Sequence, residues 1–226
     1  MKRIDELYPP AYFLGHGYGI DTKRDAMYQQ ERRRIYSYKR EGRILDVGCG
    51  VGAFLECFDD RWEKWGIEPA RFAQEAARPR GVRIIEPEDL LTSGYFDVII
   101  FRGTIQHIPR PFKYLEDARW WLKDDGVLVL LATPNTNSPY FWKRKTLPAL
   151  DPPRNWLLPS DVMLLNALSN LGFRVDQVVY PYWRTPYARP IQDHLRFALT
   201  WLTNGHAGGK FPFWRSMMEI YAFKVG

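Results

Sequence analysis

The fold is decided by the stretch ILDVGCGVGAFL at residues 44–55, where an apolar strand runs through three closely spaced glycines into a predicted helix over 52–58. Glycine lacks a Cβ and accepts positive φ, so a ligand can come close to the backbone of such a turn. The N–H groups of a helix that starts there would face the same ligand. The stretch therefore predicts an α/β protein that binds a small molecule where its first strand ends.

Apolar runs and longer amphipathic segments alternate along the rest of the chain. Predicted strands cover 44–47, 65–67, 82–85, 96–101 and 127–131, and two more follow at 173–180 and 218–225. Predicted helices cover 22–40, 70–78, 112–122 and 161–171, the last with Ser160 as its N-cap. Strands and helices at this spacing form βαβ units with helices on both faces of a parallel sheet. The pattern indicates a doubly wound, Rossmann-like, mostly parallel sheet.

The segment 181–215 is too long for a hairpin loop between the last two strands. One helical face within it carries apolar residues, namely Ile191, Leu195, Ala198, Leu199 and Leu202. We expect an inserted helix that packs on the body of the protein, and a helix on a membrane surface is the alternative. The chain is expected to form one domain, 1–226, made of an N-terminal lid and helix (1–41), a core (42–180), the insertion (181–215) and a last strand (216–226).

The composition is that of an ordinary globular protein, with 226 residues of which 46% are hydrophobic and 26% charged. The net charge of +6 favours anionic or nucleic-acid partners only slightly, because no block of five like charges occurs. The longest apolar run, 127–132, is far too short to span a membrane, and no apolar stretch follows the basic residues at the start. Cys49 and Cys57 form neither a disulfide framework nor a zinc motif, so we expect a cytoplasmic protein without a metal.

Two nucleotide cofactors are compatible with the glycine turn. Read as Gly48-x-Gly50-x-x-Ala53, the turn fits a dinucleotide fingerprint, and Glu68 lies 20 residues after Gly48, where an acid would bind ribose hydroxyls. Asp46 favours the other cofactor. A carboxylate would repel a pyrophosphate, whereas it would attract the ammonium and sulfonium groups of S-adenosylmethionine, SAM. An NAD-dependent oxidoreductase is the alternative.

The arrangement Asp46-x-Gly48-x-Gly50 resembles motif I of the class I SAM-dependent methyltransferases. Segments that resemble the second, fourth and fifth strands of that family follow in order at 66–69, 95–100 and 122–130. The resemblance covers about residues 40–180 and implies a seven-stranded sheet with an antiparallel last strand, an N-terminal helical lid and a C-terminal helical insertion. It also implies SAM as the methyl donor, with S-adenosylhomocysteine, SAH, as product.

The resemblance assigns cofactor roles to residues that follow the first four strands. Asp46 would anchor the methionine end of SAM, Glu68 would accept hydrogen bonds from the ribose hydroxyls, and Glu88 is the candidate for recognition of the adenine. The glycine turn would offer backbone N–H groups and close approach. The remaining positions assigned to the cofactor are Gly48, Cys49, Gly50, Pro69, Arg102 and Gly103.

The stretch TIQHIPRP at 104–111 is similar to a segment of the branch that includes ubiquinone-pathway, sugar and natural-product O-methyltransferases. His107 in this stretch is the catalytic candidate, because a histidine there can take the proton of an acceptor hydroxyl. Alternatively, it orients the loop through a local hydrogen bond. Gln106 replaces a Glu of that branch, and Asn155 stands where a His is common. These departures leave open a cofactor-binding protein without catalysis, acting as a partner or scaffold for a second methyltransferase.

An aromatic, glycine-punctuated segment at 8–19 would fold over the cofactor as a lid in that branch, with Tyr12 and Tyr18 lining the site. The same aromatics would equally serve as core for the helix that follows. Basic and aromatic residues interleaved at 182–215 suit a tRNA or rRNA acceptor, and they equally suit a pocket for a small molecule. The sequence thus predicts in-line methyl transfer from SAM to an oxygen of a small molecule, and it leaves the oligomeric state open.

Overall fold

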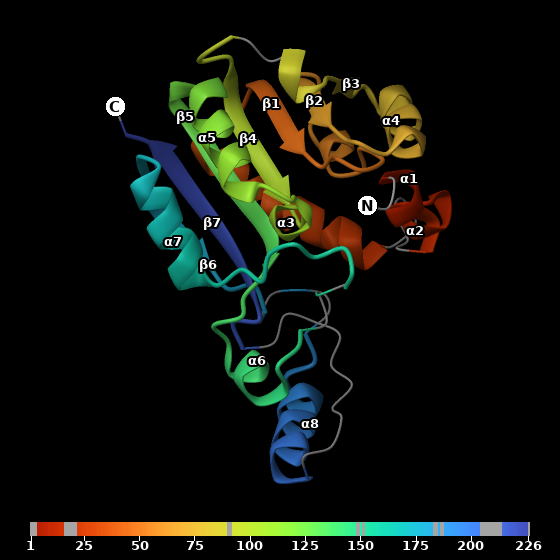
Figure 1. Cartoon of the computed structure of the whole chain (residues 1–226), viewed down its shortest axis with the longest axis vertical. Helices are drawn as coiled ribbons and strands as arrows, with labels where there is room; N and C mark the ends of the chain where they lie inside the picture. Colours follow the sequence, from red (N-terminus) through yellow and green to blue (C-terminus); the bar gives the residue numbers. More distant parts are fainter. Residues whose placement is uncertain are drawn as a thin grey trace.

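A computed structural model describes residues 4–15, 22–89, 92–147, 150, 152–182, 185, 188–203 and 214–225. Its centre is a seven-stranded sheet in the order β3-β2-β1-β4-β5-β7-β6 (Figure 1). Strands β1 to β5 pair in parallel, and β7 runs antiparallel to both β5 and β6. The predicted fold is confirmed. The strands are β1 (Gly42–Val47), β2 (Trp62–Ile67), β3 (Arg83–Ile84), β4 (Phe96–Arg102), β5 (Leu122–Pro134), β6 (Phe173–Val179) and β7 (Met217–Lys224).

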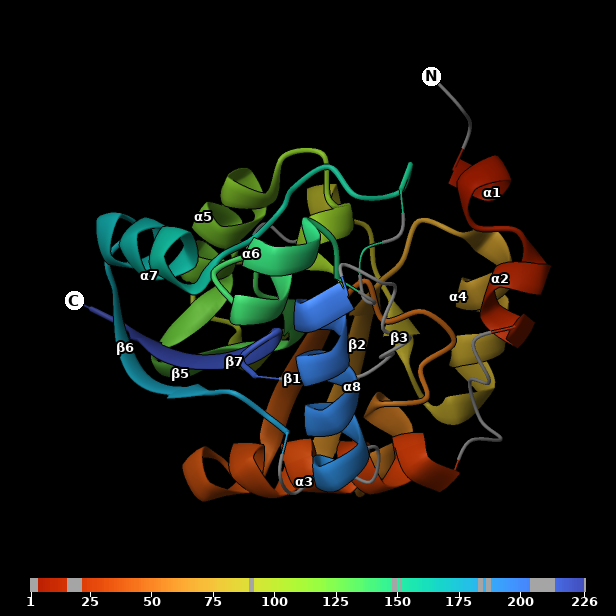
Figure 2. The ribbon, with the colours of Figure 1, turned by 90° about the horizontal axis from the view of Figure 1, so that it is seen from below.

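Helices cover both faces of this sheet (Figures 1 and 2). Successive side chains of a strand point to opposite faces, so Ile44 joins the cluster that contains Ile35 of α3, whereas Leu45 joins the cluster that contains Leu115 of α5. Helix α4 belongs with α3, and α7 with α5. Their bounds are α3 (Thr22–Tyr38), α4 (Arg71–Ala77), α5 (Pro111–Trp121) and α7 (Asp161–Asn170).

The strand order places the ligand crevice. Strand β1 lies between β2 and β4 in the sheet. The connections that leave β1 and β4 therefore run in opposite directions away from each other. Open α/β sheets bind ligands in the gap that such divergence leaves at the carboxyl ends of the strands. The remaining helices are α1 (Ile4–Leu7), α2 (Pro10–Gly15), α6 (Pro139–Arg144) and α8 (Pro190–Thr203), and the 3₁₀ turns are η1 (Leu55–Cys57), η2 (Arg78–Arg80), η3 (Pro87–Asp89) and η4 (Ile105–His107).

The helix predicted over 52–58 is wrong. After the glycine turn the chain makes only the single 3₁₀ turn η1. Gly50 and Gly52 have φ angles of 53° and 79°, which an α-helix does not contain. Strand β2 begins at Trp62, so little chain remains for a helix once the buried side chains of Phe54 and Phe58 are placed in the core. A ligand at the turn therefore meets no α-helix N-terminus.

The helix predicted inside the insertion exists as α8, but the prediction that its named apolar face packs on the body is wrong. Ile191, Leu195, Leu199 and Leu202 are between 61% and 81% exposed. The face that packs carries Phe197, whose ring centroid lies 6.4 Å from that of Tyr140 on α6. Residues 191 and 197 lie well apart around a helix of 3.6 residues per turn, so α8 has two apolar faces and buries one. No helix among the described residues is long and apolar enough to cross a membrane.

The predicted cap of α7 is confirmed, because the hydroxyl of Ser160 accepts a hydrogen bond of 3.2 Å from the backbone N–H of Met163. The variant Ser160→Ala is expected to lower the free energy of unfolding by about 1 kcal/mol, since this N–H loses its partner. Chemical denaturation measures the change. Ser169→Ala, at an exposed position near the end of the same helix, is the matched control and should change stability little. Equal losses in both variants would contradict the cap.

Candidate functional site

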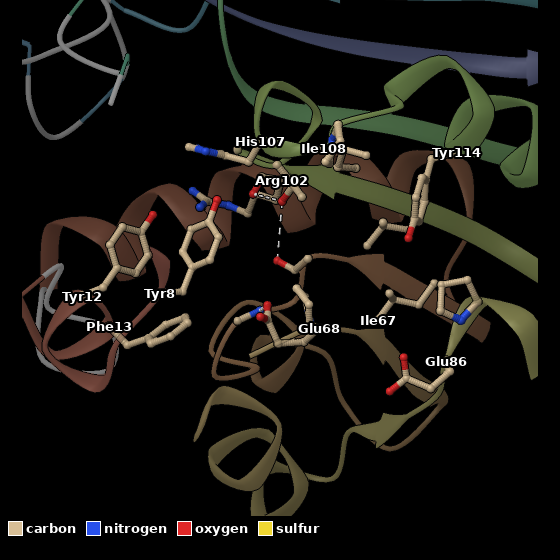
Figure 3. Close-up of a pocket in the computed structure, with 18 residues that line it drawn as sticks. Tyr8, Tyr12, Phe13, Ile67, Glu68, Glu86, Arg102, His107, Ile108 and Tyr114 are labelled. Carbon is tan, nitrogen blue, oxygen red and sulfur yellow. Dashed lines mark hydrogen bonds between the residues drawn. The ribbon is translucent and has the colours of Figure 1, made fainter. Parts of the chain in front are cut away.

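A cavity of about 280 Å³ lies at the carboxyl ends of β1, β2 and β4 (Figure 3). Figure 3 shows Tyr8, Tyr12 and Phe13 on one side, Glu68 below the centre, and Glu86 with Tyr114 on the far side. Five parts of the chain contribute: the N-terminal helices, the glycine turn, the end of β2, the segment after β3 and the segment after β4. The lining residues are Tyr8, Tyr12, Phe13, Val47, Gly48, Gly50, Ile67, Glu68, Pro69, Glu86, Pro87, Arg102, Gly103, Thr104, His107, Ile108, Pro109 and Tyr114.

The glycine turn provides close approach to its backbone. Gly48 has a φ of 81°, and a Cβ on it would lie 2.2 Å from Cγ2 of Thr104, so no larger residue fits without a shift. The N–H groups of Gly48 and Cys49 both donate to the carbonyl of Ile67, at 2.7 and 3.2 Å, and that of Gly50 donates to Glu68. These three N–H groups therefore already have hydrogen-bond partners in the protein. The turn offers a ligand close approach to its backbone rather than free hydrogen-bond donors.

Cys49 packs away from the cavity. A Cβ on Gly66 of β2 would lie 2.4 Å from its sulfur, so the thiol fills the space that this glycine leaves. Burial, together with the charges of Asp46 and Glu68, raises the pKa of the Cys49 thiol well above its ordinary value. The thiol is inert at neutral pH, and Cys49 shapes the turn through its backbone.

Glu68 is held rigidly at the end of β2. Its Oε2 accepts a hydrogen bond of 2.9 Å from the N–H of Gly50, and its Oε1 accepts one of 2.9 Å from the N–H of Ala70. The carboxylate is 7% exposed, and burial raises its pKa while the two amides lower it. Each carboxylate oxygen keeps a second lone pair. Glu68 can therefore accept two further hydrogen bonds from a ligand diol in a fixed orientation.

Arg102, at the end of β4, is paired with a buried acid that the sequence reasoning missed. Its Nε donates to Oε2 of Glu31 at 2.7 Å and its Nη2 donates to Oε1 at 3.2 Å, and its guanidinium lies 4.4 Å from the ring centroid of Tyr28. Glu31 is 1% exposed, on α3. The sequence signal for such an acid was Arg102 itself, because an arginine at the end of a buried strand requires a counter-ion. This ion pair connects α3 to the cavity wall.

Asp46 lies buried next to the cavity, and it is 2% exposed. Among the described residues, its Oδ1 accepts no hydrogen bond. The pKa of Asp46 is raised to about 7, because burial and the charges of Glu68 and Glu31, which raise it, outweigh Arg102, which lowers it. Three carboxylates thus face one guanidinium in this region. The arrangement attracts a cationic ligand and disfavours a diphosphate.

A second group of contacts connects the N-terminal helices to His107. The Nδ1 of His107 lies 3.1 Å from the carbonyl oxygen of Arg154. A carbonyl only accepts, so Nδ1 carries the hydrogen and Nε2 is the nitrogen able to take a proton. The Nε of Arg154 donates to the carbonyl of Leu7 at 2.6 Å, and its guanidinium lies 4.9 Å from the ring centroid of Tyr12. The segment around Arg154 therefore holds both the lid and the histidine.

One departure from the family pattern, Gln106, has a structural role here. The carbonyl of Gln106 accepts hydrogen bonds from the N–H groups of Trp156 and Leu157, at 2.8 and 3.3 Å, and its side chain donates to the carbonyl of Gly103 at 3.0 Å. Gln106 is buried, and Asn155 lies in the segment that docks on it. Gln106 thus fixes the loop that carries His107.

The predicted site residues are distributed unevenly. The cavity is lined by Gly48, Gly50, Glu68, Pro69, Arg102, Gly103, His107 and Tyr12. Asp46 and Cys49 lie behind this lining, and Tyr18 lies outside the described residues, as does the side chain of Glu88. The segments that hold Tyr8, Phe13 and Glu86 were expected near the cofactor, although these side chains were not singled out. The sequence reasoning missed Tyr114, which lines the cavity, and Glu31, which pairs with Arg102, because only the tertiary fold brings them to this region. Among the described residues, no group of three or more His, Cys, Asp or Glu is arranged to hold a metal ion.

Comparison with known proteins identifies the family. Residues 20–178 match the family model described as a methyltransferase domain. The chain belongs to this methyltransferase family. Its methyl donor is SAM, as the family implies. The family match is evidence against the alternative of an NAD-dependent oxidoreductase.

Curated relatives share only part of their length with this methyltransferase. It is 31% identical to the tRNA U34 carboxymethyltransferase of Aeromonas hydrophila over 136 residues, which are 52% of this chain and 40% of the relative. It is 30% identical to the ubiquinone biosynthesis O-methyltransferase of Haemophilus ducreyi over 113 residues, which are 43% of this chain and 48% of the relative. The chain therefore spans about half the length of these relatives or less.

Solved structures agree with the fold. The SAM-dependent methyltransferase of Archaeoglobus fulgidus superposes with a TM-score of 0.64 at 21% identity, covering 94% of this chain and 99% of that one. A SAM-dependent methyltransferase of Leishmania major superposes with a TM-score of 0.65 at 18% identity, covering 96% and 79%. At such identities the likeness shows the architecture alone.

The raised pKa of Asp46 predicts how cofactor affinity depends on pH. Between pH 7.5 and 5.5 Asp46 takes up a proton and no longer attracts a cation, so the affinity for SAM is expected to fall with the pH. Asp46→Asn should bind SAM about tenfold to a hundredfold more weakly at pH 7.5, the loss of one hydrogen bond to a charged group, and with a flatter pH dependence. Isothermal titration calorimetry measures both.

Asp60→Asn, at an exposed position, is the control and should behave as the unchanged protein does. An affinity of Asp46→Asn that equals that of the unchanged protein at every pH would remove Asp46 from the site.

Proposed function

We propose that this methyltransferase moves the methyl group of SAM to a hydroxyl oxygen of a small molecule and releases SAH. The observation that carries this proposal is the geometry of His107. Its ring lies at the cavity wall with Nδ1 committed to the carbonyl of Arg154, so Nε2 is the basic nitrogen. A neutral imidazole in this tautomer can take a proton from an acceptor hydroxyl at neutral pH.

The residues around the cavity fit SAM. The Oδ1 of Asp46 accepts no hydrogen bond from the described residues, and the ammonium group of the cofactor would supply one. Arg102 lines the cavity and would face the methionine carboxylate, with Glu31 fixing its guanidinium. Glu68 would accept both ribose hydroxyls, and Gly48 and Gly50, together with Pro69 and Gly103, would allow close approach. Glu88 remains the residue predicted to recognise the adenine, and its neighbours in the sequence, Glu86 and Pro87, line the cavity.

Catalysis then depends mainly on positioning. When bound, SAM supplies a methyl group that its sulfonium already activates, and alignment of two reactants can contribute effective molarities of about 10⁵ M or more. Tyr8 and Tyr12 close one side of the cavity and keep water from the acceptor. His107 removes the hydroxyl proton as the oxygen forms its bond to the methyl carbon and the carbon–sulfur bond breaks. The proton on Nε2 is later lost to solvent.

The acceptor end of the cavity is aromatic. Tyr8 lies edge-on to His107 with 6.3 Å between ring centroids, and Tyr8 and Tyr12 are 5.2 Å apart in the same manner. Phe13, whose ring centroid lies 5.3 Å from that of Tyr12, completes an aromatic wall on this side. Such a lining, with few polar groups, suits a flat or glycosidic small molecule that carries the hydroxyl. The two free cysteines support a cytoplasmic setting, and we retain the single-domain organisation as part of this proposal.

Two other functions are less well supported. An RNA acceptor is suggested by the relation to a tRNA carboxymethyltransferase and by the basic and aromatic residues at 182–215. Two basic residues of α3 do not support it, because Arg32 donates to the carbonyl of Cys57 and Arg34 pairs with Glu219. A cofactor-binding partner without catalysis was suggested by Gln106 and Asn155. Gln106 instead supports the loop of His107, so its presence is compatible with catalysis.

The role of Glu68 predicts a loss of cofactor affinity. In Glu68→Gln the amide can accept at only one of the two positions that now accept from Gly50 and Ala70, and hydrogen bonds to a charged group are lost. We expect SAH binding to weaken by about tenfold to a hundredfold in calorimetry while the far-ultraviolet circular dichroism stays the same. Glu75→Gln, which removes a surface acid of α4, should leave the affinity intact. Equal affinities in both variants would refute the assignment.

The role of His107 predicts a catalytic defect without a binding defect. In an SAH-release assay with a panel of phenols, sugars and unmodified tRNA, we expect turnover with a hydroxylated small molecule. His107→Gln should lower kcat by about 10² or more and remove the acidic limb of its pH profile, with SAH affinity within about twofold. Turnover that is unchanged at every pH would leave the histidine as a loop-orienting residue. Methylation of tRNA alone, or tight SAH binding with no transfer to any acceptor, would refute the proposed function.

A further inference from the structure

Helix α3 makes two ion pairs with the face of the sheet that it covers. Glu31 and Arg34 lie three positions apart on this helix, so their side chains are neighbours. Glu31 accepts the two hydrogen bonds from Arg102 on β4. The Nη1 of Arg34 donates to Oε2 of Glu219 on β7 at 2.7 Å, and the hydroxyl of Tyr221 donates to the same oxygen at 2.9 Å. The two ion pairs therefore adjoin each other beneath α3.

The charges of the two ion pairs act on one another. Glu31 and Glu219 are both almost fully buried, and each is 1% exposed. The pKa of Glu219 is raised to about 7, because burial and the charge of Glu31, which raise it, outweigh Arg34, which lowers it. The charge of Glu31 also raises the pKa of Asp46, next to the cavity. Glu31 therefore connects Glu219 electrostatically to the cofactor site.

Stability alone does not account for buried charges at this place. A buried ion pair gains little over apolar residues of the same size, because the loss of hydration offsets the attraction. Helix α3 also has apolar contacts to hold it, since Tyr28 and Ile35 belong to the core cluster on this face. Apolar residues could not hold a guanidinium in a fixed orientation at the cavity wall. The pair of Glu31 with Arg102 does so, because two parallel hydrogen bonds fix both planes.

The second ion pair protects the first from competition. The two pairs contain two guanidinium groups and two carboxylates, so their charges are balanced. Without the charge of Glu219, Arg34 would turn to Glu31, which lies one turn before it on the same helix. Arg34 would then take up one of the two oxygens that hold Arg102. The guanidinium of Arg102 would keep a single hydrogen bond to Glu31 and lose its fixed orientation.

We propose that Glu219 is a positioning residue for the cofactor, which holds Arg34 away from Glu31 and so keeps Arg102 oriented toward the carboxylate of the methionine end. The inference rests on the proposed function in one respect, the placement of that carboxylate at Arg102. Glu219 is not among the described residues that line the cavity, so it acts only through the two arginines and Glu31. Its effect is confined to ligands that carry the amino-acid group.

The test is calorimetry with SAH and with methylthioadenosine, a thioether nucleoside that lacks the amino and carboxylate groups. The titrations are made at about pH 8.5, where the carboxyl group of Glu219 is ionised. Glu219→Gln should weaken SAH binding by about tenfold and leave the affinity for methylthioadenosine within about twofold. The double variant Glu219→Gln/Arg34→Gln removes the competing arginine, so it should recover SAH affinity to within about threefold of the unchanged protein. Asp125→Asn, which removes the ion pair with Lys39 just after α3, is the matched control.

An ion pair that only stabilised α3 would give other results. Both ligands would weaken together in Glu219→Gln, and the double variant would lose at least as much SAH affinity as the single one. Either result, or unchanged SAH affinity in Glu219→Gln, would overturn the proposal. Arg102→Met separates this inference from the proposed function: if SAH affinity falls in Arg102→Met but not in Glu219→Gln, only the role of Glu219 is refuted. If SAH affinity is unchanged in Arg102→Met, the placement of the carboxylate is refuted, whereas the SAH-release assay tests the role of His107 separately.

Discussion

A shortage of positive charge beneath the glycine turn is the constraint on which the rest of this methyltransferase depends. Asp46, Glu68 and Glu31 converge from β1, β2 and α3, and Arg102 is the one guanidinium whose charge reaches Asp46. Burial of such a group is costly unless a ligand supplies the missing charge. In the proposed function, the sulfonium and ammonium groups of SAM would supply this charge, which a diphosphate could not do.

The contacts around Arg154 connect the two halves of the proposed reaction. This residue holds the lid through Leu7 and Tyr12, and its own carbonyl sets the tautomer of His107. In the proposed function, the position of the aromatic residues beside the cavity and the orientation of His107 would therefore both depend on one docked segment. Gln106 anchors that segment from below. These hydrogen bonds use the backbone carbonyl of Gln106, whereas its side chain donates to the carbonyl of Gly103 within the loop of His107.

The insertion shows how amphipathic patterns can mislead. The stripe from Ile191 to Leu202 has the spacing of a packed helix, yet Phe197 on another side of α8 makes the contact with Tyr140. Periodicity identifies an apolar face, but it does not say whether that face meets protein or another apolar phase. The helix predicted after the glycine turn failed for a related reason, since positive φ at Gly50 and Gly52 and the early start of β2 leave room only for a 3₁₀ turn.

The sequence by itself determined the alternation of strands and helices, the glycine turn, and the two acids Asp46 and Glu68, because local periodicity and short motifs encode these directly. It could not determine the partner of Arg102, the tautomer of His107 or the place of Tyr114 on the cavity wall. Glu31 lies 71 residues from Arg102, and Arg154 lies 47 residues from His107. Only the tertiary structure brings such distant groups together, because packing of the whole sheet and its helices sets which side chains meet at its edge.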